Sequence, residues 1–216
     1  MSFLITFEGI DGCGKSTQLA LLGSYLQGAG HSVTATREPG GTALAEAIRH
    51  YLLHTRQPLA PPTELLLFGA ARAQHVSEII RPALARGDVV LSDRFADSSV
   101  AYQGGGLGLD SDFIRRINAF ATDELKPNLT ILLDVEPEVG CARRATGSPG
   151  STASDDRIEG RGLEFQRRVR AAYLAIACAE PARVVVVDGV LPIAEAHRRI
   201  VEIVQHRALS PKTNDQ

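Results

Sequence analysis

The chain has 216 residues, 44% of them hydrophobic, which suits a single domain with a substantial core. The net charge of −2 argues against a general attraction to nucleic acid or to membrane surfaces, and we expect neither partner. No apolar run approaches the ~20 residues needed to span a bilayer. The cysteines are scattered without metal spacing and the N-terminus leads directly into a strand-like run, so we expect a cytoplasmic protein.

The first predicted strand, residues 3–7, leads into a glycine-rich loop, Gly9-Ile10-Asp11-Gly12-Cys13-Gly14-Lys15-Ser16. This run matches the phosphate-binding pattern G-x-x-x-x-G-K-S/T at every fixed position, and a helix-like stretch begins at Lys15. The glycines let backbone N–H groups surround a polyphosphate, and the helix N-terminus favours an anion. Lys15 is expected to reach the β- and γ-phosphates, and Ser16 to bind Mg²⁺. The alternative is a chance glycine turn before a helix.

Strand-like and helix-like segments then alternate to the end of the chain. Further strands are expected at residues 32–36, 88–92, 129–133 and 183–188. Helices are expected at 42–53, 63–85, up to Tyr102 with a break at Gly104–Gly106, and then at 111–122, 137–145, from 163 onward and 193–207. This alternation predicts an α/β fold, with a five-stranded parallel sheet between helices in the three-layer arrangement of P-loop NTPases.

Residues 1–209 are expected to form one domain, and residues 210–216 a disordered tail. Within the domain, the polar, Gly/Ser-rich stretch at about 146–162 is expected to be a flexible lid.

Polar residues follow three of the predicted strands, at the edge where parallel sheets bind ligands. The phosphate loop follows the first strand, Arg37 the second, and Asp93 with Arg94 the third. Asp93 stands where a carboxylate of the Mg²⁺ shell is expected, although a carboxylate at a helix N-terminus is the alternative. Arg37 and Arg94 are expected to form an arginine-lined surface beside the phosphate loop, and arginine is suited to bidentate contact with phosphates.

A second group of residues is suited to bind a nucleobase. Phe68 and Arg72 share a helix face, where a ring can stack on a base and a guanidinium can hydrogen-bond its edge. The alternative places Phe68 in the core and Arg72 on the surface. Ser99 and Gln103 share a face of the next helix and suit a polar edge. The chain has no guanine-reading Asn-Lys-x-Asp run, which argues against a GTPase.

Several runs occur together and in order, and they closely resemble the bacterial thymidylate kinase family over nearly the whole chain. They are Phe7–Thr17, Arg37-Glu38-Pro39-Gly40-Gly41-Thr42, Phe68–Arg72, Asp93-Arg94 through Ala101-Tyr102-Gln103-Gly104, and Asp156-Arg157-Ile158-Glu159. The Arg-Glu-Pro-Gly-Gly-Thr and Ala-Tyr-Gln-Gly runs carry the specificity, because many families share the phosphate loop. The resemblance implies a homodimer that transfers the γ-phosphoryl group of ATP, with Mg²⁺, to dTMP, giving dTDP and ADP in dTTP biosynthesis.

The resemblance also implies roles for individual residues. The ATP site would consist of Gly9, Ile10, Asp11, Gly12, Cys13, Gly14, Lys15, Ser16, Thr17 and Arg143. The dTMP site would consist of Asp11, Arg37, Phe68, Arg72, Arg94, Ser99, Tyr102 and Gln103, with Phe68 stacked on thymine and Tyr102 crowding the sugar 2′ position. Catalysis would use Lys15, Asp11, Arg37, Arg94 and Arg157, and Mg²⁺ would be held at Ser16 and Asp93.

The catalytic arginine is expected from the lid, because Gly12 and Cys13 stand where some relatives place an arginine in the phosphate loop. Arg157 is the first choice and Arg161 the alternative, while a solvated loop charge is the plain explanation of Arg157. Other functions remain open: a kinase of another nucleotide or of a nucleoside, and a regulator that binds ATP without turnover. The intact Lys15 and Ser16 argue against the regulator.

Overall fold

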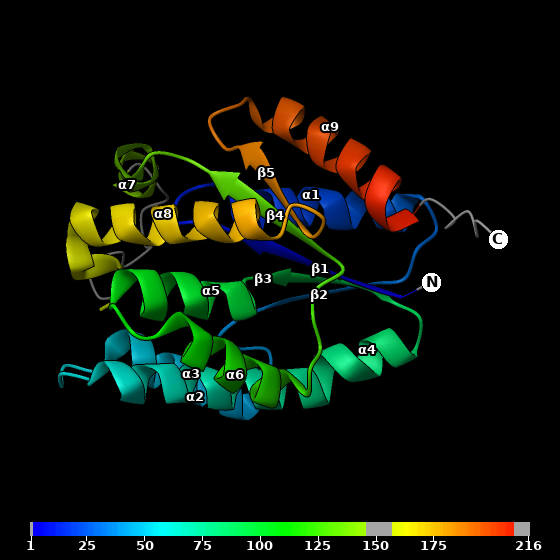
Figure 1. Cartoon of the computed structure of the whole chain (residues 1–216). Helices are drawn as coiled ribbons and strands as arrows, with labels where there is room; N and C mark the ends of the chain where they lie inside the picture. The colour runs from blue at the N-terminus through cyan, green and yellow to red at the C-terminus, as the bar shows by residue number, and fades with distance from the viewer. Residues whose placement is uncertain (1, 146–156, 210–216) are drawn as a thin grey trace.

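The computed structural model describes residues 2–145 and 157–209. Most of the expected lid, residues 146–156, and the expected tail, residues 210–216, therefore lie outside the described residues. One five-stranded parallel sheet has the order β2-β3-β1-β4-β5 (Figure 1). Its strands are β1 (Phe3–Glu8), β2 (Val33–Arg37), β3 (Val89–Asp93), β4 (Leu129–Asp134) and β5 (Val184–Asp188). The predicted α/β fold is thereby confirmed.

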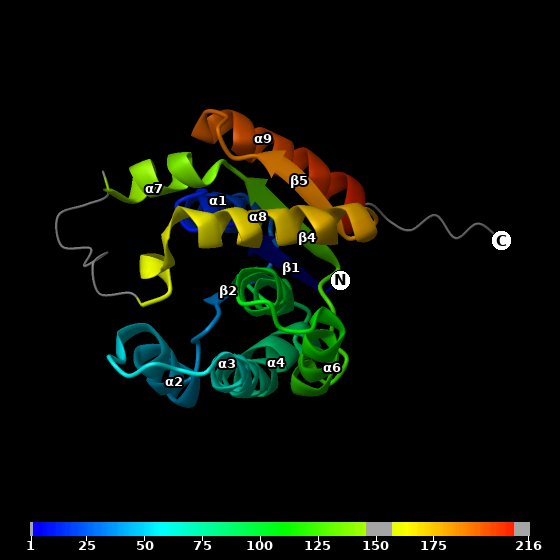
Figure 2. The same ribbon diagram turned by 60° about the vertical axis from the view of Figure 1, so that its left-hand side comes forward.

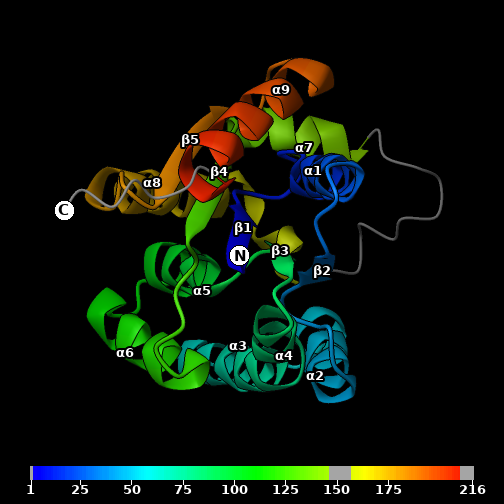
Figure 3. The same cartoon turned by 90° about the vertical axis from the view of Figure 1, so that its right-hand side faces the viewer.

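Helices cover both faces of the sheet (Figures 2 and 3). They are α1 (Lys15–Gly28), α2 (Ala43–His54), α3 (Pro61–His75), α4 (Arg81–Ala85), α5 (Ala96–Ser99), α6 (Ser111–Thr122), α7 (Pro137–Ala145), α8 (Gly162–Ala179) and α9 (Ile193–Val204). The pair α1 and α9 packs on one face, while α8 and α4 contact strands from the other face. Beyond that second layer, α3 packs against both α2 and α6.

Wider π-type turns occur in several helical segments and change two of the predicted boundaries. The predicted helix over residues 63–85 is present, but a π-helical segment, Val76–Ile80, lies between α3 and α4. The predicted break at Gly104–Gly106 is wrong, because a π-helical segment, Val100–Gly106, continues α5 through these glycines. They allow close packing: a Cβ on Gly106 would lie 2.5 Å from the ring of Phe165 on α8.

The core follows from the position of each strand in the sheet. Leu4 and Ile5 in β1 and Leu91 in β3 are fully buried, because these interior strands are covered on both faces. Strand β5 lies at an edge, and Val186 is 45% exposed. The strand expected at residues 183–188 is present, but its apolar run, which is typical of a fully buried strand, is only partly buried. In the part of the chain that the structure describes, no helix has the length and apolar character to cross a bilayer.

The strand register determines where the polar residues lie. Asp93 at the end of β3 is level with Phe7 in β1 and with Arg37 in β2. The carboxyl ends of β2, β3 and β1 therefore lie at the same edge of the sheet, and the phosphate loop begins at that edge. Ligands of open α/β sheets bind at such an edge.

Candidate active site

The phosphate loop turns sharply between β1 and α1. Gly9 and Gly14 have φ values of +135° and +101°, which residues with a Cβ rarely adopt. The ammonium of Lys15 lies inside the loop and donates to the backbone oxygens of Gly9 and Ile10, at 3.2 and 2.9 Å. A positive charge therefore lies at the centre of the loop, next to the N-terminus of α1, where polyphosphates bind.

Ser16 and Asp93 meet beside this loop. The Ser16 hydroxyl donates to Oδ2 of Asp93 across 2.6 Å. Hydroxyl and carboxylate oxygens are ligands that Mg²⁺ takes, usually together with substrate phosphates. Among residues 2–145 and 157–209, no group of three or more His, Cys, Asp or Glu side chains could hold a metal ion. The pair is thus a partial oxygen ligand set that fits a phosphate-bound Mg²⁺.

One cavity, which we call the donor cavity, lies beside the second half of the phosphate loop and the start of α1. It is lined by Gly12–Gln18, Leu133, Arg143, Arg144, Gly189, Leu191, Ile193 and Ala196. Arg143 donates to the backbone oxygen of Gly189 across 2.8 Å, so α7 is tied to the turn after β5. Leu191, just before α9, and Ile193 and Ala196 on α9 give this cavity an apolar wall next to the loop. These residues belong to no recognisable motif, so the sequence did not predict that they line a cavity.

A second cavity, which we call the acceptor cavity, meets the same loop at Asp11. It is lined by Asp11, Glu38, Pro39, Arg49, Leu53, Phe68, Arg94, Ser98, Ser99, Tyr102, Gln103 and Ile158. Six predicted substrate residues are among them: Asp11, Phe68, Arg94, Ser99, Tyr102 and Gln103. Arg37 and Arg72 do not line it. Arg37 is exposed and forms an ion pair with Glu46 across 2.9 Å.

Asp11, Arg94 and Tyr102 form a compact triangle in the acceptor cavity. Arg94 forms an ion pair with Asp11 and donates to the Tyr102 hydroxyl at 3.1 Å, and that hydroxyl lies 3.1 Å from the second oxygen of Asp11. Burial alone would raise the pKa of Asp11, but the charges of Arg94 and Lys15 and the Tyr102 hydrogen bond lower it to about 2. Asp11 is therefore ionised at neutral pH.

Arg94 is held in an uncommon backbone conformation. Its φ is +72°, in the left-handed region that costs a residue with a Cβ of order 1–3 kcal/mol. The Ser92 hydroxyl donates to the Arg94 backbone oxygen at 2.7 Å, and the Arg94 N–H donates to Phe7 at 2.9 Å. Strain of this kind gathers at functional sites, and here it directs the guanidinium toward the phosphate loop, where it donates to Gly9.

Glu8 is a fully buried carboxylate behind this triangle. It accepts hydrogen bonds from the Phe95 N–H at 2.7 Å, the Ser98 hydroxyl at 2.6 Å and the Tyr173 hydroxyl at 2.7 Å. Burial and then the charge of Asp97 raise the pKa of Glu8 to about 7. Ser98 and Tyr173 also contact the Arg94 guanidinium. Glu8 therefore holds two of the side chains that surround Arg94.

Arg72 is fully buried under the acceptor cavity. Its guanidinium donates to the Glu38 carboxylate at 2.8 Å, the Ser99 hydroxyl at 3.0 Å, the Asn118 side-chain oxygen at 2.6 Å and the Phe95 backbone at 3.1 Å. The guanidinium carbon lies 5.9 Å from the centre of the Phe95 ring, whereas Phe68 lines the cavity itself. Arg72 thus reaches the cavity through Glu38 and Ser99, and it is not the surface residue of the alternative interpretation.

Both candidate lid arginines lie on one carboxylate. Glu64 on α3 is fully buried, and Arg157 donates to it at 2.7 Å. Arg161 donates to both of its oxygens, and Gln103 donates to it at 3.0 Å. In this arrangement Ile158 covers the acceptor cavity. Neither Arg157 nor Arg161 lines the donor cavity.

Glu8, Glu64, Asn118 and Tyr173 were missed by reasoning from the sequence. Glu8 gives a weak signal, as a carboxylate at the end of an apolar strand. The other three gave none, because their importance comes from contacts with residues distant in the chain.

Comparison with known proteins identifies the family. A family model described as "Thymidylate kinase" matches residues 7–200. The chain is 50% identical to a thymidylate kinase of Thermomicrobium roseum over 215 residues, covering 98% of this chain and 100% of the relative. It is 47% identical to one of Pelobacter propionicus over 210 residues, covering 96% of each.

A solved structure agrees with these relatives. The thymidylate kinase of Ehrlichia chaffeensis aligns with a TM-score of 0.75 and 36% identity, covering 94% of this chain and 99% of that one. Together with the phosphate loop and the two cavities beside it, these similarities show that the chain belongs to the thymidylate kinase family.

Proposed function

We propose that this chain transfers the γ-phosphoryl group of ATP to dTMP, giving dTDP and ADP. One observation carries the proposal: Asp11 lines the acceptor cavity and the next residue, Gly12, lines the donor cavity. Two nucleotides bound in these cavities meet across a single loop, as a direct transfer between them requires.

The donor nucleotide binds along the phosphate loop, residues 9–17. Lys15 contacts its β- and γ-phosphates. Ser16 and Asp93 would hold its Mg²⁺, which would neutralise charge on the phosphates. Arg143 flanks the adenine, beside the apolar side chains of Leu191 and Ile193.

The acceptor nucleotide binds in the cavity next to Asp11. Phe68 stacks on the thymine ring, and Ser99 and Gln103 contact its polar edge. Arg72 supports the same edge from beneath, through its hydrogen bonds to Glu38 and Ser99, which line the cavity. Tyr102 crowds the sugar 2′ position and so favours deoxyribose.

Charge neutralisation carries most of the catalysis. An oxygen of the dTMP phosphate attacks the γ-phosphorus, the bond from that phosphorus to the β,γ-bridging oxygen breaks, and ADP leaves with the electron pair. The phosphate oxygen is already a nucleophile, so no general base is needed. Arg94 and Arg37 hold the acceptor phosphate. The exposed ion pair of Arg37 with Glu46 is worth at most about 1 kcal/mol, so Arg37 can exchange it for a phosphate.

The direct test is ATP-dependent ADP release with Mg²⁺ and one acceptor at a time: dTMP, dUMP, UMP, CMP, dGMP or thymidine. We expect strong turnover with dTMP and little with UMP or thymidine. Arg94→Ala should lower kcat/KM by an amount that corresponds to a loss of about 2–4 kcal/mol in transition-state stabilisation, as removal of a preorganised donor does. Turnover of another acceptor alone would overturn the base pocket, and no turnover would favour the non-catalytic ATP-binding regulator.

We further propose a homodimer formed through α3 and α6. Three large apolar side chains are exposed on these neighbouring helices: Leu66 is 59%, Phe113 51% and Phe120 90% exposed. Apolar exposure of this kind marks an interaction surface. In sedimentation, Phe120→Asp should shift the protein toward a ~23 kDa species, whereas Val186→Asp on the edge strand β5 should not. A parent protein that sediments only as the smaller species would exclude the dimer.

We place the reaction in the cytoplasm. Cys141 and Cys178 are free and exposed, which suits a compartment that keeps thiols reduced.

A further inference from the structure

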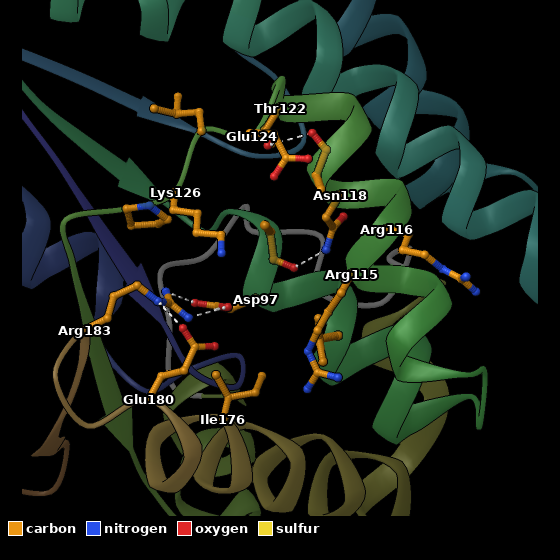
Figure 4. A pocket seen from close by; sticks show the side chains of 15 residues that line it. Asp97, Arg115, Arg116, Asn118, Thr122, Glu124, Lys126, Ile176, Glu180 and Arg183 are labelled. Carbon is orange, nitrogen blue, oxygen red and sulfur yellow. Dashed lines mark hydrogen bonds and ion pairs between the residues drawn. The ribbon is translucent and has the colours of Figure 1, made fainter.

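A third cavity lies away from both nucleotide cavities, between α5, α6 and the C-terminal end of α8 (Figure 4). None of its lining residues belongs to the donor or the acceptor cavity. Ala96, Val100, Leu125 and Ile176 give it an apolar lining, while charged side chains surround its opening. A ligand with an apolar body and one charged group would fit this apolar lining and charged opening.

The charges around the opening are unevenly satisfied. Arg183 forms a two-point ion pair with Asp97, at 2.7 and 3.0 Å, and also contacts Glu180 at 2.9 Å. Figure 4 shows this group on one side of the cavity and Arg115 on the other. Lys126, by contrast, forms neither an ion pair nor a hydrogen bond with any residue that the structure describes, and it is exposed. Arg116 also lines the cavity without an ion pair to the described residues, but its guanidinium lies 5.6 Å from the centre of the Phe113 ring and points away from the cavity in Figure 4. Lys126, whose charge also acts on Glu180, is therefore the cation placed to meet a ligand above the apolar lining.

Helix α5 forms a wall shared by this cavity and the acceptor site. Asp97 lines the third cavity, while the next residue, Ser98, lies 3.3 Å from the Arg94 guanidinium. Ser99 then accepts a hydrogen bond from Arg72 at 3.0 Å. A displacement of this four-residue helix would move contacts to both arginines.

Asn118 provides a second link between the two sites. It lines the third cavity, and its side-chain oxygen accepts from Arg72 at 2.6 Å. Its amide donates to the backbone oxygen of Ala96, the first residue of α5, at 2.9 Å. Asn118 thus lines the cavity and also holds Arg72, whereas α5 places Asp97 in the cavity and the following serines on the two arginines.

We propose that this cavity is a regulatory site for a small organic anion, with an apolar ring and one carboxylate or phosphate. The anionic group pairs with Lys126, and the ring lies against Val100 and Ile176. Occupancy changes the affinity for the acceptor nucleotide through α5 and Asn118. The binding part is independent of the proposed function, and only the coupling part rests on it.

Isothermal titration with 2-naphthoate and its neutral counterpart 2-naphthamide tests the binding part. Lys126→Ala should weaken naphthoate binding about tenfold, the scale of one charge-assisted contact, and leave naphthamide unchanged. Arg86→Ala, which removes an exposed positive charge elsewhere, should leave both unchanged. Ala119→Leu, which narrows the cavity, should weaken both. Naphthoate binding that is absent up to ~10 mM, or indifferent to both Lys126→Ala and Ala119→Leu, overturns the site.

Titration of dTMP with and without saturating naphthoate tests the coupling. We expect the dTMP dissociation constant to change at least about twofold, and the naphthoate constant to change by the same factor when dTMP is present. Lys126→Ala should remove most of this change at the same naphthoate concentration. An unchanged dTMP constant with naphthoate bound overturns the coupling. Loss of turnover alone, with both ligands still bound, counts against the proposed function instead.

Discussion

The Ser16 hydroxyl donates to the Asp93 carboxylate across 2.6 Å, although 77 positions separate the two residues. The first residue of this pair belongs to the phosphate loop and the second ends β3, so the parallel register of the sheet brings them together. Such a hydroxyl–carboxylate pair has the oxygen ligands that Mg²⁺ takes beside a polyphosphate.

Asp93→Asn tests this pair as a magnesium site. The amide keeps an oxygen for Ser16 but removes the negative charge, so we expect the Mg²⁺ concentration for half-maximal activity to rise about tenfold or more. High Mg²⁺ should restore part of kcat. Asp188→Asn is the matched control, because this carboxylate also ends a strand but caps the Val190 N–H. An unchanged Mg²⁺ requirement in Asp93→Asn would remove Asp93 from the metal shell.

Local patterns were sufficient for the strands and for the phosphate loop. Short runs rich in β-branched and apolar residues, bounded by turn residues, were enough to locate the strands, and the loop needs only glycines, Lys15 and Ser16 at fixed spacing. The edge character of β5 could not be predicted, because it depends on strand order. The prediction of a helix break at Gly104–Gly106 was wrong for a related reason. These glycines allow close contact with α8, which lies far along the chain.

The acceptor cavity was predicted in part. The residues that line it directly, such as Phe68 and Tyr102, occur in recognisable runs. Glu64 does not, because its role depends on Arg157 and Arg161, about a hundred positions away. Buried charges of this kind are paired by the fold, and a single sequence gives little sign of the partner.

The shared position of Arg157 and Arg161 on Glu64 allows the two to be separated by experiment. If Arg157 reaches the transferred phosphoryl group, Arg157→Ala should lower kcat by about 2–4 kcal/mol equivalents, with a smaller change in the KM for dTMP. Arg161→Ala should reduce kcat less than about tenfold, since Gln103 still donates to Glu64 while Arg157 is on the phosphoryl group. Steady-state kinetics with both substrates varied provides the measurement. The opposite order of effects would assign the catalytic role to Arg161.

Arg72 and Glu38 form a buried ion pair, 1% and 4% exposed. Removing the cation alone leaves a buried carboxylate without its main partner, so Arg72→Met should lower the free energy of unfolding by about 3–5 kcal/mol. The double variant Arg72→Met/Glu38→Gln should recover part of that loss, because the stranded charge is gone. Urea unfolding followed by circular dichroism compares the three proteins. Arg37→Met, at an exposed ion pair, is the control and should change stability by less than about 1 kcal/mol. A double variant no more stable than Arg72→Met would contradict the charge argument.

Glu8 should make the stability of the protein depend on pH. Its pKa is about 7 in the folded chain against an ordinary value of 4.5, so the folded state binds more protons than the unfolded state between these values. Stability therefore falls as pH rises through this window, by up to about 3 kcal/mol for a shift of this size. Glu8→Gln cannot lose a proton and should lack this decline, while exposed Glu202→Gln should keep it. Unfolding free energies at about pH 5 and pH 8 provide the comparison. Equal pH slopes in Glu8→Gln and the parent protein would show that the carboxylate ionises normally, with Arg94 then compensating fully for its burial.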